Sequence, residues 1–163
     1  GAMQEVFATL QDSTRDVLDQ CTGRQVSQVM HSMAKVGKLG EKVDRKLLDA
    51  MQRRATATAG DLEAQHVANV LWALSMLERS VDRGLLAALQ RQAAATAGGW
   101  EPTHVANVLW TLGKMGERAD RGLLEALLRR ATATAGEYRP RDVTNLLGGL
   151  AVMGERADRG IDR

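Results

Sequence analysis

The chain has 163 residues, of which 44% are hydrophobic, 26% charged and only 3% aromatic. This size and composition are typical of one globular domain and argue against an intrinsically disordered chain. No apolar run approaches the roughly 20 residues that cross a bilayer, so we expect a soluble protein with no membrane contact. The formal net charge of +2 permits a polyanionic partner without requiring one.

The cysteine and histidine content limits the chemistry open to the chain. Cys21 is the single cysteine, which excludes an internal disulfide. It is not spaced with the three scattered histidines as a zinc site requires, so we expect neither a metal ion nor a cofactor. The sequence also lacks the glycine loops and nucleophile motifs of common enzyme classes. We therefore expect no catalytic residues and no enzyme activity.

The first segment differs from the rest of the chain. Residues 1–3 resemble the remnant of a cleaved tag. Residues 4–23 are expected to form an N-terminal cap, in which Ser13 and Asp16 have the spacing of a capping box. The apolar face of this segment is short and ends at Gly23, so we do not expect it to form a full helix of the kind that follows.

An internal repeat begins after this cap. Residues 66–98 return as residues 104–136, about 38 positions later. One copy precedes this pair, with a short insertion around Leu39, and a truncated copy follows it. The four expected repeats cover residues 24–61, 62–99, 100–137 and 138–163. Since the last one stops inside its second helix, we expect the natural array to continue.

Each copy is expected to contain two amphipathic helices. The first carries one apolar face, made in the second copy by Val67, Val70, Leu71, Leu74 and Leu77. The second carries a similar face, made by Leu85, Leu86, Leu89 and Ala93. Because two such helices cannot bury both faces alone, pairs must stack on their neighbours. We predict an all-α fold, a right-handed α-solenoid of stacked antiparallel helix pairs.

Recurring residues mark the ends of these helices. An aspartate is placed to cap each second helix, at Asp44, Asp82, Asp120 and Asp158. Glycine in the left-handed conformation is expected to end the second helices, at Gly60, Gly98 and Gly136. Pro102 and Pro140 fit the first turn of the next first helix, where the missing N–H is tolerated.

The stretch Ala-Asn-Val-Leu-Trp-Ala-Leu at 68–74, which recurs with one change at 106–112, resembles the octotricopeptide repeat family. The resemblance covers roughly residues 24–163 and includes a helix-pair period of about 38 residues. It implies sequence-specific binding of single-stranded RNA in RNA stability, processing or translation. Such proteins usually act in chloroplasts or mitochondria, and related repeats occur in bacterial proteins thought to act in host cells. The sequence departs from the family pattern at Gln28, His31 and Gly148.

Two recurring residue types are candidates for RNA contact. The amides Gln28, Asn69, Asn107 and Asn145 lie away from the buried face of the first helix. They either contact bases or form a ladder of hydrogen bonds between copies, and their constancy favours the ladder. Trp72 and Trp110 either stack on bases or pack between copies, and the scarcity of aromatic residues favours packing.

Positions that differ between copies are better candidates for base readout, because a repeat code needs variable side chains on a constant scaffold. Three tracks qualify. The first is Arg24, Gln65, Thr103 and Arg141. The second is Ser32, Ala73, Thr111 and Gly149. The third is Lys35, Met76, Lys114 and Val152. We expect all three on or beside the face opposite the apolar one; ordinary drift of solvent-facing residues is the alternative.

Basic residues and histidines recur as well. The arginines near the middle of the second helices, Arg53, Arg54, Arg91, Arg129 and Arg130, form either a ridge that follows phosphates or a solvated outer face. His66 and His104 stand at the first turn of the first helix. We expect them to cap that helix or line the groove, and not to bind metal.

These observations indicate that the chain is a binding protein. The leading hypothesis is a monomeric, single-stranded RNA-binding helical-repeat module. The alternative is a protein-binding scaffold, including a bacterial protein with a host partner, because stacked helix pairs of other families present the same concave surface to peptides.

Overall fold

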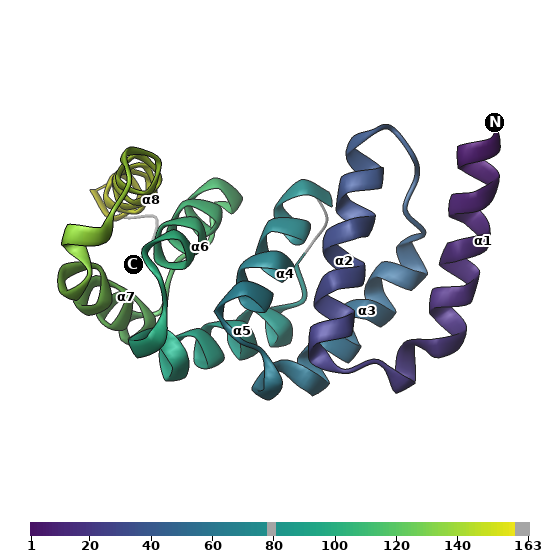
Figure 1. Cartoon of the computed structure of the whole chain (residues 1–163), viewed down its shortest axis with the longest axis horizontal. Coiled ribbons are helices and arrows are strands. Elements are labelled where there is room, and N and C mark those ends of the chain that lie inside the picture. The colour runs from purple at the N-terminus through teal and green to yellow at the C-terminus, as the bar shows by residue number, and fades with distance from the viewer. Residues whose placement is uncertain (78–80, 159–163) are drawn as a thin grey trace. The chain divides into compact units, whose positions relative to one another are not determined.

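The computed structural model describes residues 1–77 and 81–158. Within these ranges 85% of the residues are helical and no strand occurs. The prediction of an all-α fold is therefore confirmed (Figure 1).

The described ranges contain eight α-helices. These are α1 (Ala2–Val17), α2 (Gly23–Lys38), α3 (Arg45–Thr58), α4 (Ala64–Leu77), α5 (Arg83–Thr96), α6 (Pro102–Met115), α7 (Arg121–Ala133) and α8 (Pro140–Asp158). A 3₁₀ helix follows each odd-numbered one: η1 (Leu18–Gln20), η2 (Ala59–Asp61), η3 (Ala97–Gly99) and η4 (Ala135–Glu137). The even-numbered helices are the first helices of the four copies, and α3, α5 and α7 are the second helices.

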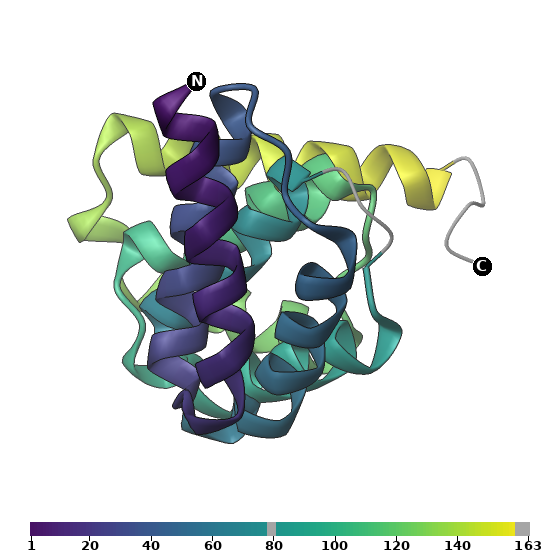
Figure 2. The ribbon, with the colours of Figure 1, turned by 90° about the vertical axis from the view of Figure 1, so that its right-hand side faces the viewer.

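The chain divides into two compact units, residues 1–89 and 90–163. In the first unit α2 packs against α3 and α4, while α1 contacts α3 (Figures 1 and 2). In the second unit α6 packs against α7 and, over a longer stretch, against α8. Each unit therefore places two first helices side by side.

The expected phase of the first helix is confirmed in the second and third copies. Val67, Leu71 and Leu74 of α4 are at most 2% exposed, and Leu109 of α6 is fully buried. The same expectation is wrong for the fourth copy. Its equivalents Val143 and Leu147 are 41% and 60% exposed, because no helix in the described ranges packs against that face of α8.

The helix ends follow the sequence in part. Pro102 and Pro140 begin α6 and α8 as expected. The predicted left-handed ends of the second helices are wrong, because Gly60, Gly98 and Gly136 lie inside the 3₁₀ helices. Positive φ occurs instead after the first helices α2 and α6, where Gly40 has φ of 97° and Gly116 has φ of 72°, values that only glycine adopts at little cost.

Of the three second helices within the described residues, two begin with the expected aspartate cap. Oδ1 of Asp44 accepts hydrogen bonds from the N–H groups of Lys46 and Leu47, and Oδ1 of Asp82 accepts one from Leu85. Asp120 makes no such bond with its side chain. Asp158 is the last residue of α8, and the helix that it was expected to cap lies outside the described residues.

The N-terminal segment contains a full helix, α1, where the sequence predicts a cap at residues 4–23 without one. Ser13 and Asp16 lie inside α1, so they do not start a helix. The capping box lies at the start of α2, where Thr22 accepts from the N–H of Gln25 and the Gln25 side chain accepts from Thr22. Since α1 ends in a 3₁₀ helix as α3, α5 and α7 do, it corresponds to the second helix of a copy.

A buried glutamine on three of the odd-numbered helices forms hydrogen bonds with the segment that connects the first and second helices of the following copy. Gln11 of α1 accepts from the N–H of Asp44 at 2.6 Å and donates to the carbonyl of Lys42. Gln90 of α5 repeats this contact with the N–H of Asp120, also at 2.6 Å, and the carbonyl of Arg118. Gln52 of α3 accepts from the N–H of Asp82 in the same way. One side chain thereby satisfies backbone groups that would otherwise lose their partners on burial.

Candidate nucleic-acid interface

Four positions on each first helix share one face, because residues at i, i+4, i+7 and i+11 fall within a narrow arc of an α-helix. We call this set the stripe. On α2 it is Arg24, Gln28, His31 and Lys35. On α4 it is Gln65, Asn69, Trp72 and Met76. On α6 it is Thr103, Asn107, Trp110 and Lys114. On α8 it is Arg141, Asn145, Gly148 and Val152. Every one of these side-chain positions is exposed or half-buried, so the first and third variable tracks and the recurring amides share one accessible face.

The stripes of α6 and α8 are joined by an amide pair. Nδ2 of Asn145 donates to Oδ1 of Asn107 at 3.4 Å, which is the ladder contact that the sequence favoured for these residues. On the next turn of α6 the Nζ atom of Lys114 lies over the indole of Trp110, 5.2 Å from its centre. Trp110 is 38% exposed. This face of the second unit therefore combines an open aromatic ring, a cation and an amide pair.

The stripes of α2 and α4 are joined by an aromatic contact. The ring centres of His31 and Trp72 are 4.7 Å apart, within the range of favourable aromatic pairs. Burial, and secondarily the charge of Lys35, lowers the pKa of His31 below its ordinary value. The imidazole is thus favoured in its neutral form in this contact, in which the two ring planes are inclined by 48°. On α4, Nε2 of Gln65 donates to Oδ1 of Asn69 at 2.9 Å.

The first turns of α6 and α8 carry a polar network. The Arg139 guanidinium donates to Oγ1 of Thr103 at 2.8 Å, and that hydroxyl donates to Asp142 at 3.3 Å. Burial raises the pKa of the Asp142 carboxyl, but hydrogen bonds from the Arg139 backbone, the Arg139 side chain and Thr103, with the Arg139 charge, outweigh it. The pKa of Asp142 lies below its ordinary value in consequence. Thr103 therefore already serves the packing of α6 on α8, whereas Arg24 and Arg141 are exposed.

The second variable track does not lie on the accessible face as expected. Ala73 is fully buried, Thr111 is 4% exposed, and Gly149 is buried. At Gly149 an added Cβ would lie 2.7 Å from backbone atoms of Leu109, so this position is where α8 crosses α6 most closely. Only Ser32 of this track is exposed. The small side chains in the other copies are required for packing and cannot contact a ligand in this arrangement.

The sequence favoured packing between copies for both tryptophans and missed that they lie on the accessible face. Trp72 packs against His31 of the preceding copy, and Trp110 is 38% exposed; both share the stripe with the amides and lysines. Their spacing of three residues after the recurring asparagine was the available signal, because it fixes both on one helical face. The buried glutamines were also missed, although Gln52 and Gln90 recur with the period of the repeat.

The histidines and arginines outside the stripe have structural roles. Nδ1 of His66 accepts from the N–H of Glu63, and Nδ1 of His104 accepts from Glu101, so the expected capping role is confirmed. Arg54 and Arg130 are half-buried, and each guanidinium makes a hydrogen bond within the fold. Their Nε atoms donate to the carbonyls of Cys21 and Trp100, at 2.9 Å and 2.7 Å. The neighbouring arginines Arg53, Arg91 and Arg129 are exposed.

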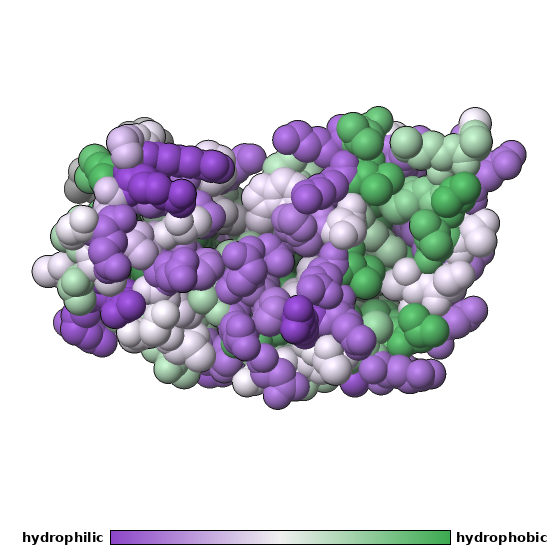
Figure 3. Space-filling view, viewed as in Figure 1, coloured by the Kyte–Doolittle hydropathy of each residue, from purple (hydrophilic) through white to green (hydrophobic). Residues whose placement is uncertain are grey.

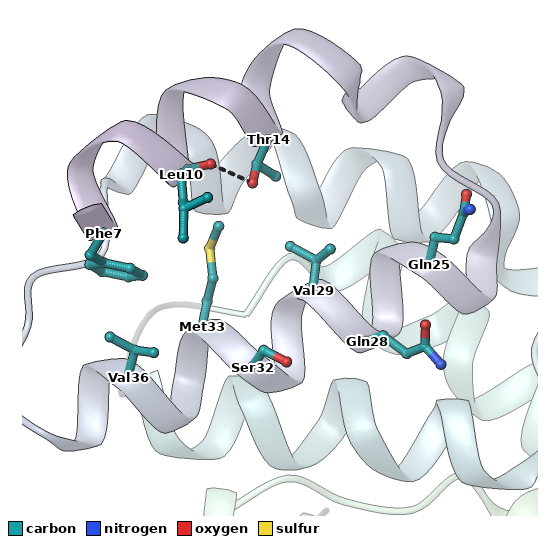
Figure 4. A pocket seen from close by; sticks show the side chains of 9 residues that line it. All are labelled: Phe7, Leu10, Thr14, Gln25, Gln28, Val29, Ser32, Met33 and Val36. Carbon is teal, nitrogen blue, oxygen red and sulfur yellow. Dashed lines mark hydrogen bonds between the residues drawn. The ribbon is translucent and has the colours of Figure 1, made fainter. Parts of the chain in front are cut away.

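A second surface feature is an apolar groove of about 410 Å³ between α1 and α2. Figure 4 shows Phe7 and Leu10 of α1 facing Met33 and Val36 of α2 across it. Gln28 and Ser32 stand at its α2 side. Hydrophobic side chains gather over α1 and α2 (Figure 3), among which Leu10 is 55% exposed.

No three histidine, cysteine, aspartate or glutamate side chains in residues 1–77 and 81–158 come together in a way that could hold a metal ion. Among the same residues, no helix has both the length and the apolar character needed to span a membrane.

Comparison with known proteins gives one result. The family model described as RNA-editing substrate-binding complex 6 protein (RESC6) matches residues 2–158, which is nearly the whole chain. No curated protein sequence matches significantly. The match spans both compact units and all eight helices of the described ranges.

Proposed function

The chain belongs to the RNA-editing substrate-binding complex 6 protein family, and from this premise we propose that it is a single-stranded RNA-binding helical-repeat module. The observation that carries the proposal is the stripe, in which aromatic, amide and cationic side chains recur on the accessible face of successive first helices. Aromatic rings stack on bases of any sequence, and lysine or arginine beside them neutralises phosphates. We place no catalytic step in this role: the chain acts by binding.

We infer further that the copies form a right-handed α-solenoid of the octotricopeptide type. The packing of α2 on α4, and separately of α6 on α8, supports this arrangement, as does the glutamine contact that fastens one joint after another. Small-angle X-ray scattering tests it, since a continuous array requires the elongated profile of stacked helix pairs. A profile of two independently tumbling units would contradict it.

The proposed function is tested by titrating the chain into a labelled, unstructured RNA of about ten nucleotides and following fluorescence anisotropy. We expect weak binding, because few copies are present, and a decline in affinity with added salt as phosphate contacts are lost. A duplex of the same sequence should bind more weakly, since its bases are not available for stacking.

A charge-matched pair of double variants separates the stripe from general electrostatics. Lys35→Gln with Lys114→Gln removes two exposed cations from the stripe, whereas Lys46→Gln with Arg129→Gln removes two from the second helices. The first pair should weaken binding and reduce the slope of affinity against salt, and the second should change both much less. Equal losses from the two pairs would mean that RNA binds by net charge alone, and the proposal would then be wrong.

A second function, docking of a protein partner, is favoured by the groove between α1 and α2. In the same unit, the first helix α2 packs against its own second helix, α3, and against the next first helix, α4. The groove between α1 and α2 is the equivalent place one copy earlier, between a second helix and the next first helix. The groove therefore fits an amphipathic helix of a protein partner that presents an apolar face as the first helices do. A synthetic peptide with the sequence of residues 138–158 serves as the probe, because Leu147 of α8 provides such a face.

Binding of this peptide should be lost in Leu10→Asp, which places a charge in the groove, and retained in Leu39→Asp. Leu39 is 71% exposed and does not line the groove. Unchanged binding in both variants would exclude the groove as the docking site.

A further inference from the structure

The clearest difference between the two units lies at the aromatic position of the stripe. In the first unit this position holds a ring on both helices, and His31 lies against Trp72 in a tilted contact, with ring centres 4.7 Å apart and ring planes inclined by 48°. In the second unit Trp110 has Gly148 at the equivalent place on α8. An added Cβ at Gly148 would lie 3.4 Å from Cδ1 and 3.7 Å from Nε1 of Trp110. A side chain at position 148 would therefore start at the edge of the Trp110 indole. Because the residue is glycine, Trp110 has no second ring beside it at that position, whereas His31 and Trp72 have each other.

We propose that a nucleobase of single-stranded RNA stacks on Trp110 beside Gly148, in the place that an aromatic side chain takes in the first unit. This inference rests on the proposed function and names one site within it. The exposure of Trp110, 38%, gives a flat aromatic surface for stacking.

The groups around this place suit a nucleotide. The Asn107–Asn145 pair lies one turn before Trp110 and Gly148 on the two helices. An amide side chain carries two donors and two acceptor sites, so a single hydrogen bond between the two amides leaves an N–H and a carbonyl oxygen for a base edge. On the next turn Lys114 supplies a cation within reach of a phosphate.

The contact between Lys114 and Trp110 does not exclude a base. A cation–π contact at an exposed site is weak, whereas an ammonium gains from pairing with a phosphate and an indole gains from stacking on a base. A bound nucleotide therefore replaces the lysine on the ring and gives it a phosphate to pair with.

The test uses reciprocal variants of the two units and an unstructured RNA of five nucleotides as the probe. Gly148→His supplies the missing ring and should weaken binding about tenfold, as loss of one stacked base does. It should also reduce the quenching of tryptophan fluorescence by the RNA, while leaving the salt dependence nearly unchanged. Val143→His is the matched control: it adds the same ring to an exposed position of α8 that lies away from the stripe, and it should bind normally.

Trp110 provides an independent pair of variants. Trp110→Phe keeps an aromatic surface and should retain most of the affinity, whereas Trp110→Ala should lose about tenfold. In the first unit, His31→Ala uncovers Trp72 and should increase binding and quenching. Circular dichroism melting shows whether each variant is folded; should Gly148→His unfold, the Trp110 and His31 variants decide.

The outcomes separate this site from the function itself. If the unmodified chain binds RNA but Gly148→His or Trp110→Ala, while folded, leaves affinity and quenching unchanged, the base site is wrong and the proposed function stands. If the unmodified chain does not bind single-stranded RNA at all, both are overturned.

Discussion

Two adjacent glycines on α8 allow a sharp test of how closely it crosses α6. A Cβ added at Gly149 would lie 2.7 Å from the carbonyl carbon and oxygen of Leu109 and 2.9 Å from the nitrogen of Trp110. These distances are about 1 Å shorter than the optimal separation of non-bonded atoms. Because the atoms belong to the backbone, the two helices must move apart to accept the methyl group. At Gly148 the same change makes only an ordinary contact, 3.4 Å from the Trp110 ring.

The magnitudes follow from two opposing terms. Replacing glycine by alanine within a helix stabilises it by about 1 kcal/mol, and this gain applies equally to both positions. Inserting a group into a closely packed contact costs about 1–3 kcal/mol, and this cost applies only to Gly149. We therefore expect Gly148→Ala to stabilise the protein slightly, and Gly149→Ala to be about 1–3 kcal/mol less stable than Gly148→Ala.

Urea unfolding followed by far-UV circular dichroism measures the difference. The common gain in helix propensity cancels between the two variants, so the difference reports the crossing of α6 and α8 alone. Equal midpoints for the two variants would show that the helices do not approach as closely at Gly149 as the structure places them, and the assignment of this track to packing would be wrong.

Three further predictions concern buried contacts and pH. Gln90→Ala leaves the backbone groups at Asp120 and Arg118 without partners and should cost about 1–3 kcal/mol in urea unfolding; a smaller loss would mean that water replaces the amide. Because the pKa of His31 is lowered, stability should decline as pH falls below its ordinary value of 6.5, and melting curves of His31→Phe should lack that decline. The pKa of Asp142 is also lowered, so its ionised form stabilises the fold above about pH 4 and this contribution disappears on further acidification. Asp142→Asn should therefore flatten the acid limb of the stability profile, and an unchanged limb would show that its hydrogen bonds do not favour the ionised carboxylate.

The sequence was sufficient to predict that the copies contain paired helices, but not to predict every residue at which these helices contact one another. Apolar spacing placed Val67, Leu71 and Leu74 in the core correctly, because a large apolar side chain gains most from burial. Hydropathy says little about small residues. Ala73, Thr111 and Gly149 are neutral in that respect, and their variation between copies suggested an exposed surface. In the structure they are buried, since close helix crossings require small side chains and tolerate several of them.

The fourth copy shows a second limit of sequence reasoning. Val143 and Leu147 have the same apolar character as the buried residues at equivalent positions, yet they are exposed. Burial depends on whether a neighbouring helix covers the face, which the sequence of one helix does not contain. Trp72 and Trp110 show a related limit. Trp72 packs against the preceding copy as the sequence favoured, but Trp110 is 38% exposed, because a large ring can lie at the border between a packed and an open face.

The spacing of the first helices constrains how RNA can follow the stripe. Packed α-helices lie about 8–10 Å apart, whereas stacked nucleotides along one strand advance only about 3.4 Å each. A strand that presents one nucleotide to each first helix must therefore be extended, with its bases unstacked from one another. Unstacking is unfavourable unless another flat surface replaces the lost neighbour, which is what an exposed indole provides. Under the proposed function, the tryptophan in the stripe is thus required by the geometry of the helix array, and the amide pair that joins adjacent stripes sets the distance over which the strand must stretch. A duplex cannot meet this requirement, because its bases remain stacked and paired.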